Sequence, residues 1–388
     1  MALRSLRTLS LTFAVLAFTA APSFSAQPQP RPYLQGLAFP TNLAFAPDGR
    51  LFYTEKSTGN VRIVRNGALR EEPFVTLPVV PDAERGLLGI AIGPDFETDP
   101  WIYLYLSDAT DGINRLVRVR ADSDRATGEP ETLLDGLDSA AGYHNGGDLA
   151  FGVDGSLFVT LGEAHEAERA QDPSDLGGKI VRLEPDGSVP ADNPFGPGNP
   201  VWSYGHRNSF GICVDPVTGD LWETENGPTS DDEINLLRPA GNYGWPDVMG
   251  SGGPEGTIDP VVDHVQEIAP TGCAVWRGDL CYGSYLDGAI RRLDLPAGRD
   301  PRPVAVSDLG EPVYDVAVGP DDRLYISSPS GIWRLDAPPN GTVSVRASAG
   351  PSRSYPWWGW LALAAGVGLA VVLFLRLRAE RPTKPSGA

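Results

Sequence analysis

Three groups of polar residues have the types and spacing that chemistry requires. His144 stands in the segment Tyr143–Asp148 beside two glycines, which let a ligand come close to the backbone. Imidazole is the usual general base near neutral pH. Glu163 follows the next apolar run, where its carboxylate can orient the ring. The two residues indicate a proton-accepting pair, and a surface histidine near an unrelated glutamate is the alternative.

The other two groups point to ligand binding. Arg207 and Asn208 offer a guanidinium and an amide, which suit an anionic or polyoxygenated ligand. Further along, the Gly227-Pro228 bend exposes carbonyl oxygens, and carboxylates, amides and a phenol surround it between residues 225 and 246. These are the hard oxygen ligands that calcium prefers. A solvated acidic loop is the alternative for this last group.

A repeated pattern must position these groups. A short apolar run, a turn usually built from Asp with Gly or Pro, and a second apolar run recur about every 40 to 60 residues. The copies begin at Leu43, Ile90, Leu149, Ile212, Cys273 and Val316. Such a repeat predicts an all-β fold, a six-bladed β-propeller, with a two-sheet sandwich as the alternative. The loops on one face of a propeller converge on its central channel, so we expect the polar groups there.

Composition excludes several classes of protein. The chain has 388 residues and a formal charge of −19, which argues against nucleic-acid binding, because few cations are present to replace phosphate counterions. Three Cys and four His leave little room for a disulfide-dense scaffold or a zinc cluster. Gly and Pro lie between apolar runs, as an all-β chain with many turns requires.

The N-terminus has the pattern of a targeting segment. Residues 1–25 contain two arginines, a short apolar run and then small residues, which predicts a cleaved secretory signal peptide. An uncleaved membrane anchor is the alternative, although the apolar run is short for a membrane span.

The C-terminus has the pattern of a membrane anchor. Residues 357–375 are apolar and uncharged, begin with several aromatic residues, and have the length of a transmembrane helix. The tail 376–388 is basic, which places the C-terminus in the cytoplasm. We therefore expect the propeller, residues 26–340, to be a periplasmic or cell-surface domain joined to the helix by a linker, residues 341–356. A buried soluble helix is the alternative.

Several motifs together resemble the glucose/sorbosone dehydrogenase family. They are the segments 144–151, 204–208, 227–235 and 242–246, and the resemblance extends from about Leu37 to Asp336. Characterised members are six-bladed propellers that oxidise aldoses with pyrroloquinoline quinone (PQQ) and calcium. The resemblance implies a membrane-anchored oxidoreductase that acts on a sugar or small polyol and passes electrons to an unidentified acceptor. Some members are binding ectodomains, so a non-catalytic propeller that binds a glycan or a protein is the alternative.

The resemblance also implies roles for individual residues. His144 is similar to the base that takes the proton of the sugar C1 hydroxyl as the lactone forms, and Glu163 occupies the position that supports it. Arg207 and Asn208 resemble contacts to the cofactor, and Glu84 stands where the quinone-binding enzymes have a cofactor-binding Gln.

The implied calcium ligands lie in the third group. The backbone carbonyls of Gly227 and Pro228 resemble ligands of the calcium that polarises the cofactor. Glu233 and Tyr243 fall where relatives bind a second, structural calcium.

Several cofactor positions depart from the family pattern. Glu84 replaces a neutral Gln, Leu286 aligns with a cofactor-binding Lys, and Pro312 and Tyr314 align with two Arg. The cofactor carries three carboxylates, and unpaired buried carboxylates are costly. These departures predict weak binding of PQQ unless Arg85 or Arg291 supplies a substitute cation.

Two cysteines flank one predicted turn. Cys273 and Cys281 lie symmetrically about Arg277-Gly278, so they could pair across a hairpin in an oxidising compartment. Cys213 is in a predicted strand and is expected to be a small buried apolar residue.

Overall fold

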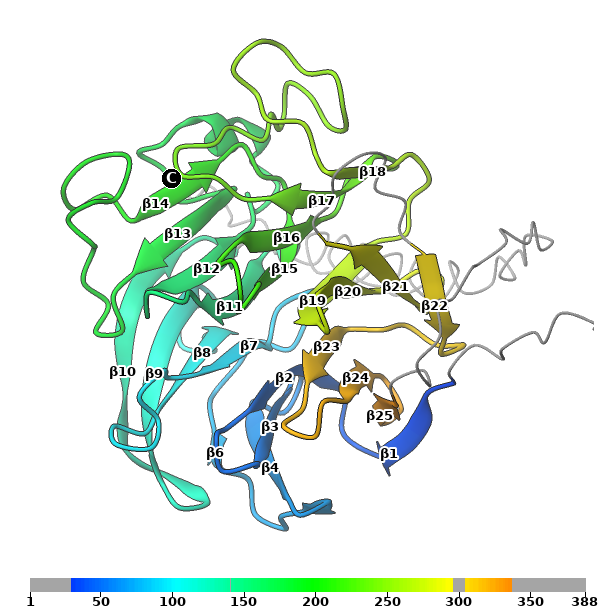
Figure 1. The fold of residues 1–388 in the computed structure, drawn as a ribbon. Helices are drawn as coiled ribbons and strands as arrows, with labels where there is room; N and C mark the ends of the chain where they lie inside the picture. Colours follow the sequence, from blue (N-terminus) through cyan, green and yellow to red (C-terminus); the bar gives the residue numbers. More distant parts are fainter. Residues whose placement is uncertain (1–28, 140, 296–303, 337–388) are drawn as a thin grey trace, which may run out of the picture. The chain divides into compact units, whose positions relative to one another are not determined.

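The computed structural model describes residues 29–139, 141–295 and 304–336, in which β-strands form six sheets. Figure 1 shows these sheets around a common centre, with one strand of each sheet next to that centre. The described chain is a six-bladed β-propeller, which confirms the predicted fold. Within these residues the one helix is a short 3-10 helix, Ala167–Gln171.

The blades follow one another along the chain, each from its innermost strand outward. The first has β2 (Pro40–Phe45), β3 (Leu51–Glu55), β4 (Asn60–Arg65), β5 (Ala68–Leu69) and β6 (Val75–Thr76). The second has β7 (Leu87–Ile92), β8 (Trp101–Ser107), β9 (Asn114–Asp122) and β10 (Arg125–Leu137). The third has β11 (Gly146–Phe151), β12 (Leu157–Leu161), β13 (Lys179–Leu183) and β14 (Val201–Tyr204).

The remaining blades repeat the same order. The fourth has β15 (Ser209–Val214), β16 (Leu221–Glu225), β17 (Asp232–Leu236) and β18 (Val262–His264). The fifth has β19 (Pro270–Trp276), β20 (Asp279–Ser284), β21 (Ala289–Asp294) and β22 (Val304–Asp308). The sixth has β23 (Asp315–Val318), β24 (Leu324–Ser328), β25 (Gly331–Leu335) and, at its outer edge, β1 (Arg31–Gln35).

The N-terminal strand closes the ring. β1 pairs antiparallel with β25, so the last blade contains both ends of the described propeller. The closure is made by backbone hydrogen bonds between Arg31 and Gln35 on one strand and Gly331 and Arg334 on the other. This pairing covers the outer edge of β25 and holds the start and the end of the described chain in one blade.

The repeated turn has a local cause. Between β11 and β12, the carboxylate of Asp154 accepts a hydrogen bond from the backbone N–H of Ser156, 3.0 Å away. Gly155 has a φ of +83°, which a residue without a side chain adopts at no steric cost. The Asp-Gly pair therefore fixes a tight reversal, and the two strands bring their apolar residues to the same sheet.

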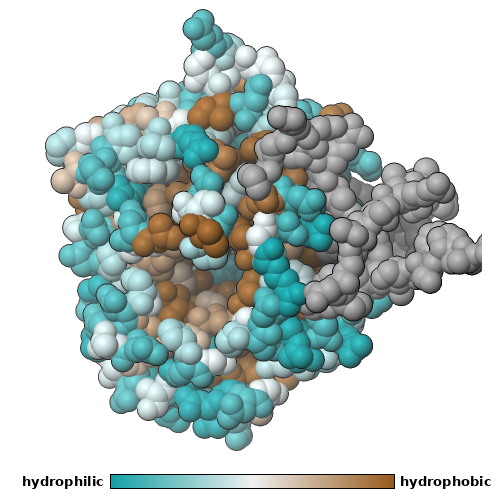
Figure 2. Space-filling model, in the orientation of Figure 1, coloured by the Kyte–Doolittle hydropathy of each residue, from teal (hydrophilic) through white to brown (hydrophobic). Residues whose placement is uncertain are grey.

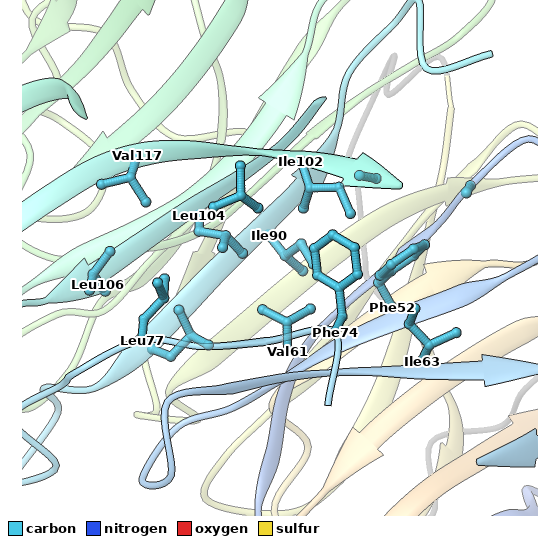
Figure 3. Close-up of a cluster of buried hydrophobic side chains, with 14 of the residues drawn as sticks. Phe52, Val61, Ile63, Phe74, Leu77, Ile90, Ile102, Leu104, Leu106 and Val117 are labelled. Atoms are coloured by element: carbon cyan, nitrogen blue, oxygen red, sulfur yellow. The ribbon is translucent and has the colours of Figure 1, made fainter. Parts of the chain in front are cut away.

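Apolar side chains between neighbouring blades form the core. The contact between the first and second blades contains Phe52, Val61 and Phe74 from one blade and Ile90 and Leu104 from the other (Figure 3). Phe52 is fully buried and meets Phe74 edge to face at 5.3 Å between ring centroids. These contacts hold adjacent blades together where no strand pairing joins them.

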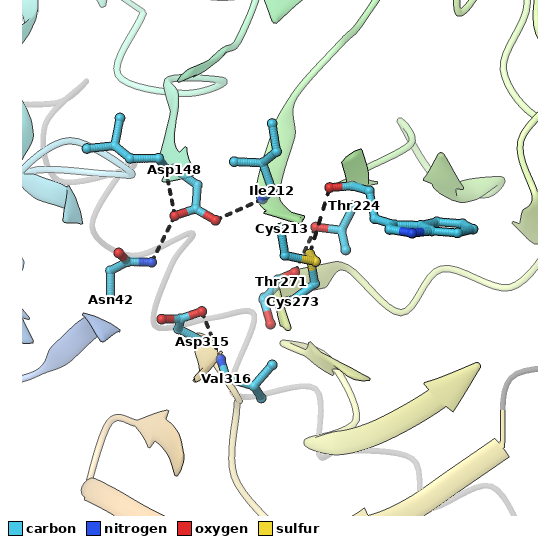
Figure 4. Close-up of a disulfide and its surroundings, with 11 residues drawn as sticks. Asn42, Asp148, Ile212, Cys213, Thr224, Thr271, Cys273, Asp315 and Val316 are labelled. Atoms are coloured by element: carbon cyan, nitrogen blue, oxygen red, sulfur yellow. Dashed lines mark hydrogen bonds between the residues drawn. A yellow bond between two sulfur atoms is a disulfide. The ribbon is translucent and has the colours of Figure 1, made fainter. Parts of the chain in front are cut away.

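The innermost strands surround a central channel. A cavity of about 300 Å³ lies in it, lined mostly by apolar side chains, and Figure 2 shows a hollow with apolar atoms around it at this position. At one end of the cavity, Asp148 accepts hydrogen bonds from the side-chain amide of Asn42 at 3.0 Å and from the backbone N–H of Ile212 at 2.8 Å (Figure 4). These bonds cross-link three blades at the axis.

The cysteine pairing predicted from the sequence is wrong. The disulfide joins Cys213 in β15 to Cys273 in β19, with Cα atoms 5.7 Å apart, and Cys281 is a buried free thiol (Figure 4). In the β19–β20 hairpin, Cys273 is opposite Tyr282 and Cys281 is opposite Ala274. The register is thus shifted by one residue from the one that would place Cys273 opposite Cys281. Because successive side chains of a strand point to opposite faces, these two side chains lie on opposite faces of the sheet.

The predicted targeting and membrane segments lie outside the described residues. These segments are residues 1–25, the linker 341–356, the helix 357–375 and the tail 376–388. Within the part of the chain that the structure describes, there is no helix long and apolar enough to cross a membrane.

The disulfide leads to a direct prediction. Chain unfolded without reductant should react as if it had one thiol, that of Cys281, although it contains three Cys. Cys213→Ser should lower the free energy of unfolding by about 2–5 kcal/mol, because the disulfide restricts the unfolded chain. Thiol titration in denaturant and equilibrium unfolding measure both effects. Cys281→Ala is the control that should leave no reactive thiol, and three reactive thiols in the wild type would contradict the assignment.

Candidate functional site

Strand register places the predicted site residues on one face of the propeller. In each blade the start of the innermost strand pairs with the end of the next strand, as Gly146 pairs with Leu161 and Ser209 with Glu225. Residues just before the innermost strands therefore meet residues just after the second strands. The backbone N–H of Glu163 also donates to the carbonyl of Arg207 at 3.0 Å, which joins the third and fourth blades at this face.

His144 and Glu163 form the pair that the sequence predicted. His144 Nδ1 lies 2.8 Å from Glu163 Oε1, and both side chains are buried, with His144 7% and Glu163 2% exposed. The backbone N–H of His144 donates to Glu84 Oε2 at 2.7 Å, which fixes the loop from the second blade. A carboxylate that accepts Nδ1–H leaves the lone pair on Nε2, so His144 has the tautomer of a general base.

A second imidazole was missed from the sequence. The ring of His165 stacks on that of His144 with 4.1 Å between centroids, and its backbone N–H donates to Glu163 Oε2. Tyr143 meets His165 edge to face. A histidine two residues after the supporting glutamate was the available signal, because the short loop returns it toward the same carboxylate.

Arg207 is engaged by the backbone of the calcium-binding loop predicted from the sequence. Its Nη1 donates to the carbonyls of Asn226 and Gly227 at 2.9 and 3.0 Å, and its guanidinium lies over Trp245. Burial lowers the pKa of Arg207, an effect that the carboxylates of Glu163, Glu225 and Glu84 oppose. This guanidinium is thus a cation among carboxylates.

The predicted contacts at Asn208 and at the bend have structural partners of their own. Asn208 is buried, and its side-chain oxygen accepts the N–H of Gly146 at 3.4 Å. Since Gly227 O accepts from Arg207, a calcium ion at Gly227 and Pro228 would compete with that guanidinium for the carbonyl. The predicted cofactor contact Arg207 and the predicted calcium ligand Gly227 are thus hydrogen-bonded to each other.

Glu233 and Tyr243 lie deeper in the fourth blade. Glu233 Oε1 accepts the backbone N–H of Gly250 at 2.6 Å, and burial raises the pKa of Glu233 to about 9. The Tyr243 hydroxyl donates to the carbonyl of Leu236 at 2.8 Å, and its ring stacks on His206. The phenol is therefore used within the fold, and Tyr243 has its backbone carbonyl to offer a cation.

A six-bladed propeller with a buried His–Glu pair and an arginine at one end of its channel is the architecture expected of the family that the sequence motifs resemble. The family model "Glucose / Sorbosone dehydrogenase" matches residues 37–332. The chain belongs to the glucose/sorbosone dehydrogenase family.

Known relatives agree with this membership. The aldose sugar dehydrogenase YliI of Escherichia coli is 32% identical, over 75% of this chain and 87% of its own length. The solved structure of the PQQ-bound aldose sugar dehydrogenase of Streptomyces coelicolor is 33% identical, with a TM-score of 0.73 over 79% of this chain and 96% of that one. The mouse hedgehog-interacting protein is more distant, 28% identical over 42% of this chain and 27% of its own length.

Arg207 is a cation at a position where the resemblance implies a contact to PQQ, whereas other implied cofactor positions lack a free charge. Arg85 is held by Asp82, with its Nε and Nη2 each 2.6 Å from a carboxylate oxygen, and Arg291 pairs with Asp287. Leu286 is 37% exposed and provides no charge. Neither predicted substitute cation is thus free to pair with a carboxylate of the cofactor.

The position of Arg207 leads to a prediction on stability and pH. Arg207→Ala should lower the free energy of unfolding by about 1–3 kcal/mol, because two carbonyls lose a charged donor. Without this cation, the folded-state pKa values of nearby carboxyls rise, so the folded variant holds protons more tightly and loses stability as the pH rises. Urea unfolding at pH 5 and pH 8 should show a larger loss at pH 8. An equal loss at both values would contradict the electrostatic role.

Proposed function

We propose that this chain oxidises the C1 hydroxyl of an aldose sugar or a similar polyol to the lactone, with His144 as the general base. The observation that carries the proposal is the buried His144–Glu163 pair at the channel end, 2.8 Å between Nδ1 and Oε1. Membership of a family with aldose sugar dehydrogenases supports the class of reaction and of substrate.

The chain's own residues account for the proton. His144 Nε2 accepts the proton of the C1 hydroxyl, and the Glu163 carboxylate stabilises the imidazolium that results. A quinone cofactor, when bound, supplies the acceptor for the C1 hydride. Arg207 and Asn208 would hold that cofactor, with calcium at the carbonyls of Gly227 and Pro228 in place of the Arg207 guanidinium from which Gly227 accepts a hydrogen bond here. His165, stacked on His144, covers one face of the ring and keeps it in place.

Replacing the base tests the reaction. His144→Ala should lower kcat by about a hundredfold or more, the range for loss of a positioned general base, in protein that is still folded, although its unfolding temperature should fall because the buried Glu163 carboxylate loses its partner. The measurement is dye-linked oxidation of a panel of aldoses by protein loaded with calcium and PQQ. Wild-type turnover by a folded His144→Ala variant would overturn the proposal.

A non-catalytic binding propeller is the second candidate function. The site has few free cations for an anionic cofactor, and its rim carries exposed aromatic rings, with Tyr143 40% and Tyr285 42% exposed. Such rings stack on sugars and pack in protein interfaces. A wild-type protein that neither binds PQQ nor turns over an aldose, yet retains a glycan or protein ligand, would favour this candidate.

Changing the charge at two of the departing positions tests the prediction that this chain binds PQQ weakly. The double variant Glu84→Gln/Leu286→Lys should bind PQQ about tenfold more tightly or better, equivalent to about 1.4 kcal/mol. Gln keeps an oxygen for the N–H of His144, and Leu286 is exposed enough to accept Lys.

The control places the lysine charge of the double variant elsewhere. Val217, 89% exposed, lies in the turn after β15, and Val217→Lys should leave affinity for PQQ unchanged. Quenching of tryptophan fluorescence by added PQQ gives the dissociation constants. Equal affinities for the wild type and the double variant would contradict the charge argument.

We further propose that the propeller is an extracytoplasmic domain on a single membrane helix. Support comes from the Cys213–Cys273 disulfide, since such bonds persist in oxidising compartments, and from the sequence patterns of residues 1–25 and 357–375. The compartment can be tested by blocking free thiols at cell lysis and then counting the blocked cysteines. One blocked cysteine is expected for an oxidising compartment, and three would contradict the proposal.

A further inference from the structure

The fourth blade buries a second set of polar groups behind the candidate site. On the paired strands β16 and β17, Glu223 is opposite Asn235 and Glu225 is opposite Glu233. His206 precedes β15 and points to the same place. These side chains are 0–1% exposed. An all-polar cluster so deep in a β-sheet is costly unless its charges are compensated.

Three of these residues have the geometry of metal ligands. His206 Nδ1 lies 2.9 Å from Glu225 Oε2 and 4.0 Å from Glu223 Oε1. One ligand atom from each of the three residues lies within 4.8 Å of the other two. The ring is fixed from outside, because His206 Nε2 is 2.9 Å from Ser203 Oγ and Tyr243 stacks on its face.

Unpartnered atoms point into the cluster. Glu223 Oε1, the oxygen nearest His206, has no hydrogen-bond partner within the described residues, and neither has Asn235 Oδ1 or Ser209 Oγ. A buried acceptor without a donor costs free energy. Two buried carboxylates so close together need either bound protons or an external cation to balance their charge.

The nearby cations of the described chain do not supply it. Lys179 Nζ is held by the backbone carbonyls of Arg169, Ala170 and Gly177. The guanidinium of Arg207 donates to the carbonyls of Asn226 and Gly227, and only its backbone N–H reaches Glu225. The cluster therefore lacks a cation from protein side chains.

We propose that His206, Glu223 and Glu225 bind a divalent transition-metal ion, of which zinc is the probe of choice, as a structural centre of the fourth blade. An imidazole nitrogen with carboxylate oxygens suits zinc and its neighbours, whereas calcium takes six to eight oxygen ligands. The donors differ from the Gly227, Pro228, Glu233 and Tyr243 positions implied for calcium. Complete burial fits a structural site, in which a fourth ligand would complete the tetrahedral coordination that these three side chains begin.

Such an ion would also support the candidate site. Glu225 accepts the backbone N–H of Arg207 as well as contacting His206, so a metal that fixes this carboxylate also fixes the start of β15. The proposal concerns this cluster alone and does not depend on the reaction proposed above.

The competing account makes the opposite prediction for one variant. Without a metal, burial raises the pKa of Glu223 to about 8, so the cluster would hold protons in place of the cation. Glu223→Gln is a neutral isostere of the protonated acid, and it should then be as stable as the wild type or more stable. If a metal is bound, the same substitution removes a charged ligand and destabilises the protein.

The experiment uses the full chain. Elemental analysis of purified protein should find about one transition-metal ion per chain, and chelation with EDTA should lower the unfolding temperature by about 5–10 °C. With calcium first returned in excess to fill the separate calcium positions, zinc should still raise the unfolding temperature of the chelated protein. Cobalt added to the chelated protein should give the visible absorption of a tetrahedral site. Glu223→Gln should lose both the metal and the response to zinc.

Asp148→Asn is the matched control, since it removes a buried carboxylate that is not near a histidine cluster, and it should keep the response to zinc. The proposal is overturned if chelated wild-type protein shows no change in unfolding temperature with zinc and no cobalt spectrum. Glu223→Gln protein that is as stable as the wild type also overturns it. Should the variant fail to fold, the wild-type titrations alone decide.

Discussion

The pairing of β1 with β25 is the interaction on which the rest of the structure depends. By closing the ring with backbone hydrogen bonds, it sets the six innermost strands at fixed positions around one axis. His144 and Arg207 lie in different blades, and the N–H of Glu163 reaches the carbonyl of Arg207 only because those blades are held side by side. Ring closure thus sets the relative positions of the loops that carry the site.

Burial of acidic groups near the axis is the main electrostatic feature of the closed ring. Asp148 at the cavity, Glu163 beside His144 and Glu225 beside His206 are each nearly inaccessible to water. Asp148 is compensated by backbone and amide donors, while Glu163 has a histidine and the nearby Arg207. At Glu223, where one carboxylate oxygen has no donor, the proposed metal ion would compensate the buried charge. Acidic residues are therefore buried inside the blades as well as exposed on the surface.

The proposed reaction has two separate requirements, a base and a bound cofactor. His144 and Glu163 form a hydrogen-bonded pair, which is the arrangement that the proposed proton transfer requires. Two of the cations that could neutralise an anionic cofactor, Arg85 and Arg291, are bound to their own aspartates, whereas Arg207 pairs with no carboxylate in a salt bridge within the described residues. Proton acceptance and cofactor affinity are separate physical requirements, and this chain satisfies the first better than the second.

The sequence alone determined the blades and much of the site, because Asp-Gly turns and alternating apolar runs are local signals and because His144, Glu163, Arg207 and Asn208 stand at fixed offsets from them. It did not determine which residues meet across blades. The disulfide partner of Cys273 is in another blade, and a hairpin register one residue away from symmetry excluded Cys281. Strand pairing and the loop before β15 bring His206, Glu223 and Glu225 together, so no short sequence motif predicts this cluster. Contacts between elements distant in sequence depend on the closed tertiary structure, since only the ring decides which faces are apposed.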